Sequence, residues 1–260
     1  MRTAKSNSSK AMRLFVGQSS CNNQYQREIA VMRTFVLVHG SWTGGWCWEQ
    51  LRPYLEAQGH RVLAPSLTGV ADRHHLATEE TGLRTHIDDV SNLIEWERAE
   101  NVILVGHSYG GMVITGVAAK VPQRLAHLVY LDAFLPRKGE SAWDLLPWLR
   151  DAFQSLRLSD RPWLVRPVAT GTLPPEIASV VEDRLTPMPI RTHEEPLPTA
   201  PSVDLAATYL HCVAEPSHFN EVAARASASG MEVKTLDAGH MALLTHPMDI
   251  AAILLHTAMA

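Results

Sequence analysis

This sequence has few cysteines, no long apolar run and no large excess of charge, and each absence removes a class of protein. Three cysteines among 260 residues are too few and too scattered for a disulfide framework or a zinc site, so we expect them reduced in a cytoplasmic protein. No apolar run approaches the roughly 18 residues that span a bilayer. A formal net charge of -4 provides no basic surface for nucleic acid.

Histidine is abundant, but its spacing argues against a metal site. The 13 histidines include no His-x-His and no His-x-x-x-His pair, which are spacings that place two ligands on one face of a strand or helix. His74 and His75 are adjacent in a polar stretch that we interpret as a solvated loop. We expect no metal ion, no membrane or nucleic-acid partner, and a monomer or homodimer.

The first 31 residues differ from the rest of the chain. Met1–Gln26 is rich in Ser, Asn and Gln, carries basic residues, and is followed by the first acid only at Glu28. This composition predicts a disordered leader. A start codon placed too early is the alternative, because the folded pattern begins directly after Met32. We expect one domain over residues 32–260, with enough apolar residues for one substantial core.

From Met32 onward, short apolar segments alternate with segments of helical spacing. The expected strands are residues 34–38, 60–65, 101–106, 127–131, 208–213 and 232–236, and helices are expected at about 47–57, 83–97, after 110, at 220–226 and from 247. Alternating strands and helices predict an α/β fold with a doubly wound, mostly parallel central sheet flanked by helices.

Residues 133 to about 203 break this alternation. They contain eleven prolines and several tryptophans, and they are too long and too apolar for a connecting loop. We interpret them as a helical cap inserted over the sheet, which excludes water and supplies apolar walls for a substrate. We expect Trp143 and Trp148 of this cap, together with Trp42, to contact the substrate.

The apolar run after Asn101 ends in a Gly-x-Ser-x-Gly motif, Gly106–Gly110, and then continues as a helix. We interpret this stretch as a buried strand that enters a very tight turn with Ser108 at its tip. Glycines at both ends of the motif allow the strand and the helix to approach closely. The serine oxygen is then lifted towards the substrate, which makes Ser108 the candidate nucleophile.

A second glycine-rich segment, His39–Trp46, follows the first expected strand directly. Open α/β sheets bind ligands at the carboxyl ends of their strands, and the glycines of this segment let backbone N–H groups point into a crevice. We expect the backbone N–H groups of Ser41 and Tyr109 to form an oxyanion hole beside Ser108.

A serine hydroxyl needs a base, and imidazole has a suitable pKa for that role. His240 is the candidate, because it lies in the loop just past the last expected strand. The imidazole in turn needs a carboxylate that fixes its tautomer. Asp132 and Glu215 both qualify, since each ends a strand and lies between the serine and the histidine in sequence.

Three motifs together resemble one superfamily. The segments His39–Trp46, Val105–Met112 and Ala238–Leu244 look like those of α/β-hydrolase fold proteins. More narrowly, they are similar to those of bacterial pyrethroid and carbamate esterases, plant methyl-ester esterases and hydroxynitrile lyases. The resemblance covers Met32 to the C-terminus and is weakest in the cap.

The resemblance implies that Ser108 is the nucleophile and His240 the base. This branch usually places an aspartate six residues after the tyrosine of the strand at 208–213, and here that position holds Glu215. We therefore favour Glu215 as the triad acid. Asp132, the location used by haloalkane dehalogenases, is the rival.

The same resemblance narrows the reaction. Dehalogenases and epoxide hydrolases of this fold use an aspartate nucleophile, and hydroxynitrile lyases carry a lysine where this chain has Met241. What it implies is hydrolysis of a small, largely apolar carboxylic ester or carbamate through an acyl-enzyme, without a metal or organic cofactor. The alternatives are the same triad acting on a carbon–carbon bond, an amide or a lactone, or a receptor-like ligand binder with little turnover.

Overall fold

The computed structural model describes residues 32–168, 173–214 and 217–259, and the structural statements below concern these ranges. The leader expected over residues 1–31 lies outside the described residues, and so does Glu215. Within the described ranges, no helix is long and apolar enough to cross a membrane.

Six parallel strands form the central sheet, in the order β2-β1-β3-β4-β7-β8. Their bounds are β1 Thr34–Val38, β2 Arg61–Leu63, β3 Val102–His107, β4 Leu125–Leu131, β7 Ala207–Cys212 and β8 Glu232–Leu236. Each of them overlaps a segment for which the apolar pattern predicted a strand, with ends that differ by at most two residues. The predicted fold class is therefore confirmed.

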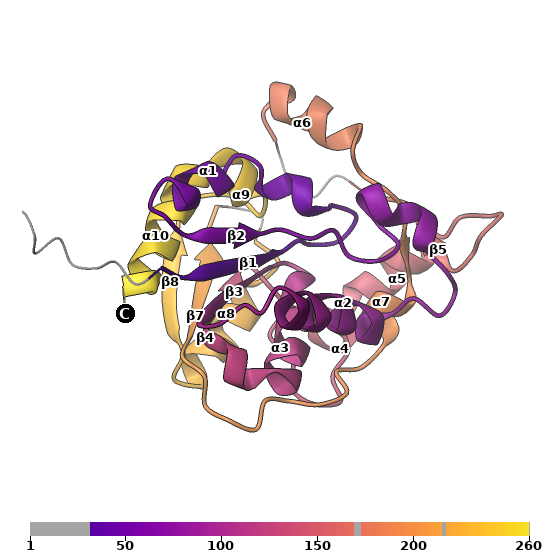
Figure 1. Cartoon of the computed structure of the whole chain (residues 1–260). Helices are drawn as coiled ribbons and strands as arrows, with labels where there is room; N and C mark the ends of the chain where they lie inside the picture. The colour runs from indigo at the N-terminus through magenta and orange to yellow at the C-terminus, as the bar shows by residue number, and fades with distance from the viewer. Residues whose placement is uncertain (1–31, 169–172, 215–216, 260) are drawn as a thin grey trace, which may run out of the picture. The chain divides into compact units, whose positions relative to one another are not determined.

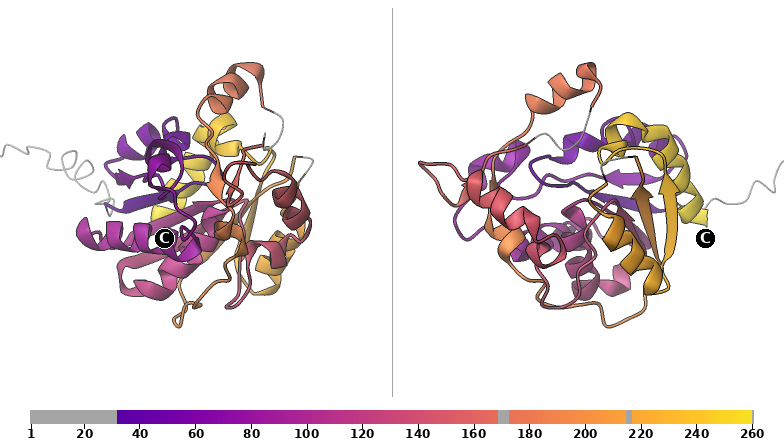
Figure 2. Two further views of the ribbon diagram at one scale, coloured as in Figure 1. Left: turned by 90° about the vertical axis from the view of Figure 1, so that its right-hand side faces the viewer. Right: turned by 180° about the vertical axis from the view of Figure 1, so that it is seen from behind.

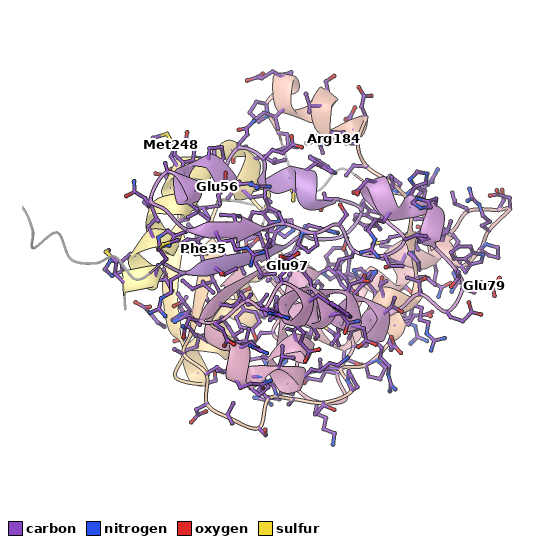
Figure 3. All side chains as sticks on the ribbon, viewed as in Figure 1. Phe35, Glu56, Glu79, Glu97, Arg184 and Met248 are labelled. Atoms are coloured by element: carbon purple, nitrogen blue, oxygen red, sulfur yellow. The ribbon has the colours of Figure 1, made fainter. Side chains whose placement is uncertain are left out.

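Helices cover both faces of this sheet (Figure 1). One face carries α1 Arg52–Glu56, α9 Ala242–Thr245 and α10 Pro247–Met259, and the other carries α2 Leu83–Trp96, α3 Gly110–Lys120 and α8 Asn220–Ala228. Successive strand residues pack against opposite helix layers, since Phe35 packs with the first group of helices and Val36 with the second. In Figure 3, Phe35 lies inside the protein whereas Met248, on α10, lies at its periphery.

The helix predicted over residues 47–57 is divided in two. A short 3-10 turn spans Gly45–Trp48, and α1 begins only at Arg52. Pro53 lies in the first turn of α1, where a residue without an N–H group loses no helical hydrogen bond. Proline therefore favours a new helix start here over a continuous helix.

The segment between β4 and β7, predicted as a cap, contains four helices and a small two-stranded sheet in the part that the structure describes, which omits residues 169–172. The helices are α4 Ala142–Leu145, α5 Trp148–Ser155, α6 Pro175–Glu182 and α7 Arg191–Glu194, and β5 Leu164–Val165 pairs antiparallel with β6 Met188–Pro189. The sequence predicted the helices but not this strand pair. In Figure 1, α5 and α7 lie to the right of the sheet, and the left view of Figure 2 shows them from that side.

The strand order creates a crevice at the carboxyl edge of the sheet. Strand β1 lies between β2 and β3, and the chain leaves β1 towards α1 on one face but leaves β3 towards α3 on the other. The two loops therefore diverge, which is how open α/β sheets form ligand sites. Val38 pairs with Gly106, and His107 pairs with Leu131, so residues just beyond β1, β3 and β4 meet at this edge.

Candidate active site

Ser108 lies at the tip of the turn between β3 and α3, in a strained backbone conformation. Its φ angle is 52°, in the left-handed region that non-glycine residues rarely adopt. Its carbonyl oxygen accepts hydrogen bonds from the backbone N–H groups of Gly111 and Phe134, at 3.0 and 3.1 Å. A Cβ atom on Gly106 would lie 2.6 Å from the carbonyl oxygen of Gly110. The turn therefore requires glycine, as the sequence motif predicted.

Asp132 and His240 form a hydrogen-bonded pair in which the carboxylate is buried and the imidazole is partly buried. The Nδ1 atom of His240 lies 2.7 Å from Oδ2 of Asp132, which directly follows β4. Asp132 is 1% exposed, and its other carboxylate oxygen accepts the backbone N–H of Cys212 at 3.2 Å. A carboxylate can only accept, so Nδ1 of His240 donates, and Nε2 is the nitrogen that remains available to a substrate or a serine.

His107 and Phe219 hold the His240 ring from two sides. The Nε2–H of His107 donates to the backbone carbonyl of His240 at 2.8 Å, and the two imidazole centroids lie 4.7 Å apart. The Phe219 ring stacks on that of His240, with centroids 5.3 Å apart. Burial, followed by the charge of His240, lowers the pKa of His107 well below its usual value. His107 is therefore a neutral donor that fixes the backbone of His240.

The loop after β1 is fixed by His39. Its Nδ1–H donates to the Gly40 carbonyl at 2.8 Å, while Nε2 accepts the backbone N–H of Leu67 at 3.0 Å. Burial lowers the pKa of His39 to about 4, so the ring is neutral near pH 7. A Cβ atom on Gly40 would lie 2.9 Å from Cβ of Ser108. Glycine at this position thus lets the loop approach Ser108 closely.

The two residues expected to form the oxyanion hole flank the serine. Ser41 lies in the loop after β1 and lines the same cavity as Ser108. Tyr109 directly precedes α3, so its backbone N–H is at the start of that helix, where the dipole favours negative charge. The Tyr109 side chain turns away into the core and donates its hydroxyl hydrogen to Nδ1 of His86, at 3.0 Å. Only the backbone of Tyr109 is available to a substrate.

The strand-end loops and the cap enclose one cavity of about 530 Å³. This volume is typical of small-molecule sites. Ser108, His240 and Ser41 line it from the sheet side, and the cap adds apolar walls. Those walls come from α5 and its surroundings, namely Leu146, Trp148, Leu149, Ala152, Phe153, Leu156 and Val168.

Of the three tryptophans expected to contact a substrate, the structure brings two to the cavity. Trp42 lines it, but is also 4% exposed, stacked on Phe153 and hydrogen-bonded through its indole N–H to the Val165 carbonyl at 3.3 Å. Trp148 lines the cavity and is half exposed. Trp143 is not among the residues that line it. Its ring instead packs against the core and under the guanidinium group of Arg150.

Sequence reasoning missed His193 of α7, which also lines the cavity. Its ring is buried against Tyr109 and Phe153, with centroids 4.8 and 4.5 Å away. Its Nε2 lies 3.0 Å from Oγ of Ser41. No motif surrounds His193 in the sequence, so only folding could reveal that it reaches the loop after β1. His74 and His75, expected in a solvated loop, lie exposed in a 3-10 turn at Ala71–Leu76.

Comparison with known proteins gives the class of this fold and site. The model of the alpha/beta hydrolase family matches residues 35–253, and the chain belongs to that family. The family resemblance stated from the three motifs is thereby confirmed.

Within the family, the chain is similar to esterases. The carbendazim hydrolyzing esterase of Nocardioides sp. (strain SG-4G) is 38% identical over 240 residues, which cover 85% of this chain and 97% of that protein. Salicylic acid-binding protein 2 of Nicotiana tabacum is 43% identical over 106 residues, which cover 39% of this chain and 40% of that protein. An extracellular α/β-hydrolase from a Paenibacillus species has a similar fold, with a TM-score of 0.72, 24% identity, and coverage of 86% of this chain and 98% of its own.

Proposed function

We propose that this protein is a serine carboxylesterase that hydrolyses small, largely apolar carboxylic esters or carbamates through an acyl-enzyme. The observation that carries the proposal is the hydrogen bond between the buried Asp132 carboxylate and His240, which lines the same cavity as Ser108. The Nocardioides relative, which aligns over nearly its whole length, is a carbendazim hydrolyzing esterase and supports the same reaction class.

In the proposed mechanism, Ser108 Oγ attacks the carbonyl carbon while Nε2 of His240 accepts the hydroxyl proton. The backbone N–H groups of Ser41 and Tyr109 stabilise the oxyanion of the tetrahedral intermediate. His240 then returns the proton to the leaving alkoxide, and the alcohol departs from the acyl-enzyme. Water attacks the acyl-enzyme by the same steps, which releases the acid and restores Ser108.

We propose Asp132 as the acid of the triad, in place of Glu215, which the sequence favoured. Two contacts support this choice. The Asp132 carboxylate accepts from Nδ1 of His240 through one oxygen and from the Cys212 backbone through the other, so its position is fixed by the fold. A buried carboxylate held in this way stabilises the imidazolium that forms when His240 takes the proton.

The cavity supports a small substrate with an apolar acyl or alcohol group. Phe153, Leu146 and Leu149 give it apolar walls, and Trp42 and Trp148 border it. Burial of apolar substrate surface against such walls is favourable by about 25 cal/mol per Å². A cytoplasmic location and a monomeric or homodimeric state remain predictions of the sequence, and both are compatible with this reaction.

The test is hydrolysis of p-nitrophenyl butyrate and hexanoate by the wild type and by Ser108→Ala. Removal of a catalytic serine costs about 10⁶-fold in kcat in serine hydrolases, so the variant is expected to be inactive. Ser155→Ala is the matched control, because Ser155 is exposed and its hydroxyl bonds only to the Ala152 carbonyl of its own helix. Equal rates for Ser108→Ala and the wild type would overturn the proposed function.

A further inference from the structure

A chain of hydrogen bonds connects the loop after β1 to the cap. Ser41 Oγ lies 3.0 Å from Nε2 of His193, and Nδ1 of His193 lies 2.9 Å from Oγ1 of Thr192. Thr192 Oγ1 in turn lies 2.7 Å from the carbonyl oxygen of Pro189. The chain therefore starts at a cavity-lining hydroxyl and ends at a backbone carbonyl of β6.

The Pro189 carbonyl, at the end of this series of hydrogen bonds, fixes the direction of every hydrogen bond in the series. A carbonyl can only accept, so the single hydroxyl hydrogen of Thr192 goes to Pro189. Thr192 Oγ1 must then accept from Nδ1–H of His193. A neutral imidazole carries one N–H, so Nε2 of His193 accepts, and the hydroxyl hydrogen of Ser41 is donated to it.

Burial keeps the His193 ring neutral. His193 is 1% exposed and is packed between the rings of Tyr109 and Phe153. Burial lowers its pKa to about 3, with a smaller contribution from His86. His193 therefore carries no second proton in the pH range in which an esterase of this kind works.

The side chain of Ser41 thus offers the cavity a hydrogen-bond acceptor and no donor. Its only hydroxyl hydrogen is held by His193, while its oxygen retains a lone pair. The hydroxyl hydrogen of Thr43, in the same loop, is likewise donated to the Gly40 carbonyl at 3.1 Å. Oγ of Ser41 is three covalent bonds from the Ser41 backbone N–H that we assign to the oxyanion hole, so this acceptor lies beside the carbonyl of a bound substrate.

We propose that Oγ of Ser41 accepts a hydrogen bond from an N–H or O–H group attached to the scissile carbonyl or to its neighbouring carbon. The enzyme then prefers carbamates with a free N–H, and α-hydroxy esters, over simple alkyl esters. His193 and Thr192 are positioning residues, because they act only by orienting the Ser41 hydroxyl. This inference rests on the proposed function, since it specifies the substrate of the same site.

The test compares two methyl esters of nearly equal shape. Methyl N-phenylcarbamate carries N–H where methyl phenylacetate carries CH₂, and methanol release measures kcat/KM for both. Ser41→Ala keeps the backbone N–H of the oxyanion hole and removes the acceptor. We expect the carbamate-to-phenylacetate ratio of kcat/KM to fall about tenfold, the usual worth of one hydrogen bond. The ratio cancels any effect of Ser41→Ala that both substrates share.

The direction of these hydrogen bonds is tested by Thr192→Val. The substitution nearly preserves the shape of the side chain, and Thr192 does not line the cavity. Without an acceptor for Nδ1–H, His193 can adopt the other tautomer and donate to Ser41, whose hydrogen then turns into the cavity. We expect the same ratio to fall several-fold. Thr257→Val is the matched control, because Thr257 Oγ1 donates within α10 to the Ile253 carbonyl and does not line the cavity. We expect it to keep the wild-type ratio.

The outcomes separate this inference from the proposed function. Ser108-dependent hydrolysis of both esters with an unchanged ratio in Ser41→Ala overturns the acceptor role and leaves the esterase intact. An unchanged ratio in Thr192→Val overturns the orientation of the hydrogen-bond chain. Methanol release that does not depend on Ser108 overturns the proposed function and this inference together.

Discussion

The carboxyl edge of the sheet and the cap that faces it use their backbones in different ways. At the sheet edge, Trp42, Ser108 and Asp132 all have positive φ angles, of 61°, 52° and 42°. Among the described residues of the cap, over 133–203, Gly139 is the only residue in that region, with a φ angle of 86°. Three of the six non-glycine residues with a positive φ angle among the described residues therefore lie at this edge, where the proposed chemistry occurs, and the described part of the cap supplies walls and side chains from ordinary backbone.

Among the variants that test this contrast, Asp132→Asn at the sheet edge is expected to have the largest effect. An amide in place of the carboxylate favours the wrong tautomer of His240, so kcat is expected to fall about 10⁴-fold, or about 5.5 kcal/mol of activation free energy. The measurement is kcat for a p-nitrophenyl ester, with circular dichroism to check folding, because Asp132 also accepts the Cys212 backbone N–H.

Glu215→Gln is the companion variant for the choice of acid. If Asp132 is the acid, this substitution leaves kcat within a few-fold of the wild type. A collapse of kcat in Glu215→Gln, with Asp132→Asn still active, would reverse the assignment.

A second prediction concerns buried histidines where the cap meets the sheet. The pKa is lowered to about 4 for His39 and to about 3 for His193, both by burial, whereas an unfolded histidine titrates near 6.5. Below that pH the unfolded state binds protons that the folded state excludes, so the free energy of unfolding decreases as pH falls. By pH 5 the loss is about 2 kcal/mol per residue, or about 4 kcal/mol for the pair.

Urea unfolding at pH 7.5, 6 and 5 measures this dependence, in a window above the usual titration of carboxylates. His193→Phe is expected to reduce the loss of unfolding free energy between pH 6 and pH 5 by about 1.2 kcal/mol. His75→Asn, at an exposed position, is expected to keep the wild-type slope. Equal slopes for His193→Phe and the wild type would mean that His193 is not buried as a neutral ring.

The third prediction compares two glycines near the site. A Cβ atom on Gly111, in the first turn of α3, would lie 2.0 Å from the Phe134 carbonyl oxygen, whereas nothing lies within 4 Å of one on Gly239. We expect Gly111→Ala to lower the free energy of unfolding by about 1–3 kcal/mol through overpacking. Gly239→Ala should change it by less than about 0.5 kcal/mol, and a similar loss in both variants would contradict the close approach at Gly111.

The smallest effect is expected in the cap. Trp148 borders the cavity and is half exposed, so Trp148→Ala removes only part of the apolar contact with a substrate. We expect KM for p-nitrophenyl hexanoate to rise about fivefold, or about 1 kcal/mol, with kcat nearly unchanged. Trp96→Ala is the matched control, since Trp96 is exposed on α2 outside the cavity. An unchanged KM in Trp148→Ala would remove Trp148 from the substrate site.

The fold was largely predictable because its signals are local. Apolar runs such as Thr34–Val38 must be strands buried on both faces, and the structure has β1 at those bounds. The tight turn at Ser108 follows from the glycines of its motif. The division of the helix at 47–57 was missed although Pro53 is visible in the sequence, because its position within a helix depends on where that helix begins.

The sequence of the cap carries fewer local signals than that of the sheet. Tryptophans of the cap were expected to contact a substrate because the cap was interpreted as the source of its apolar walls, but Trp143 packs against the core and Trp148 borders the cavity. No sequence period distinguishes the two, since the cap helices are short. His193 carried no signal, because its partner Ser41 lies more than a hundred residues away in the chain.

The sequence by itself determined which segments form strands, the turn that carries Ser108 and the two acids compatible with His240. Each of these depends on neighbouring residues or on the order of residues in the chain. Only the tertiary structure decided that Asp132 lies within hydrogen-bonding distance of His240, and that the cap brings His193 to Ser41. Such contacts depend on how separate elements pack, and hydrogen bonds form only over distances that packing sets.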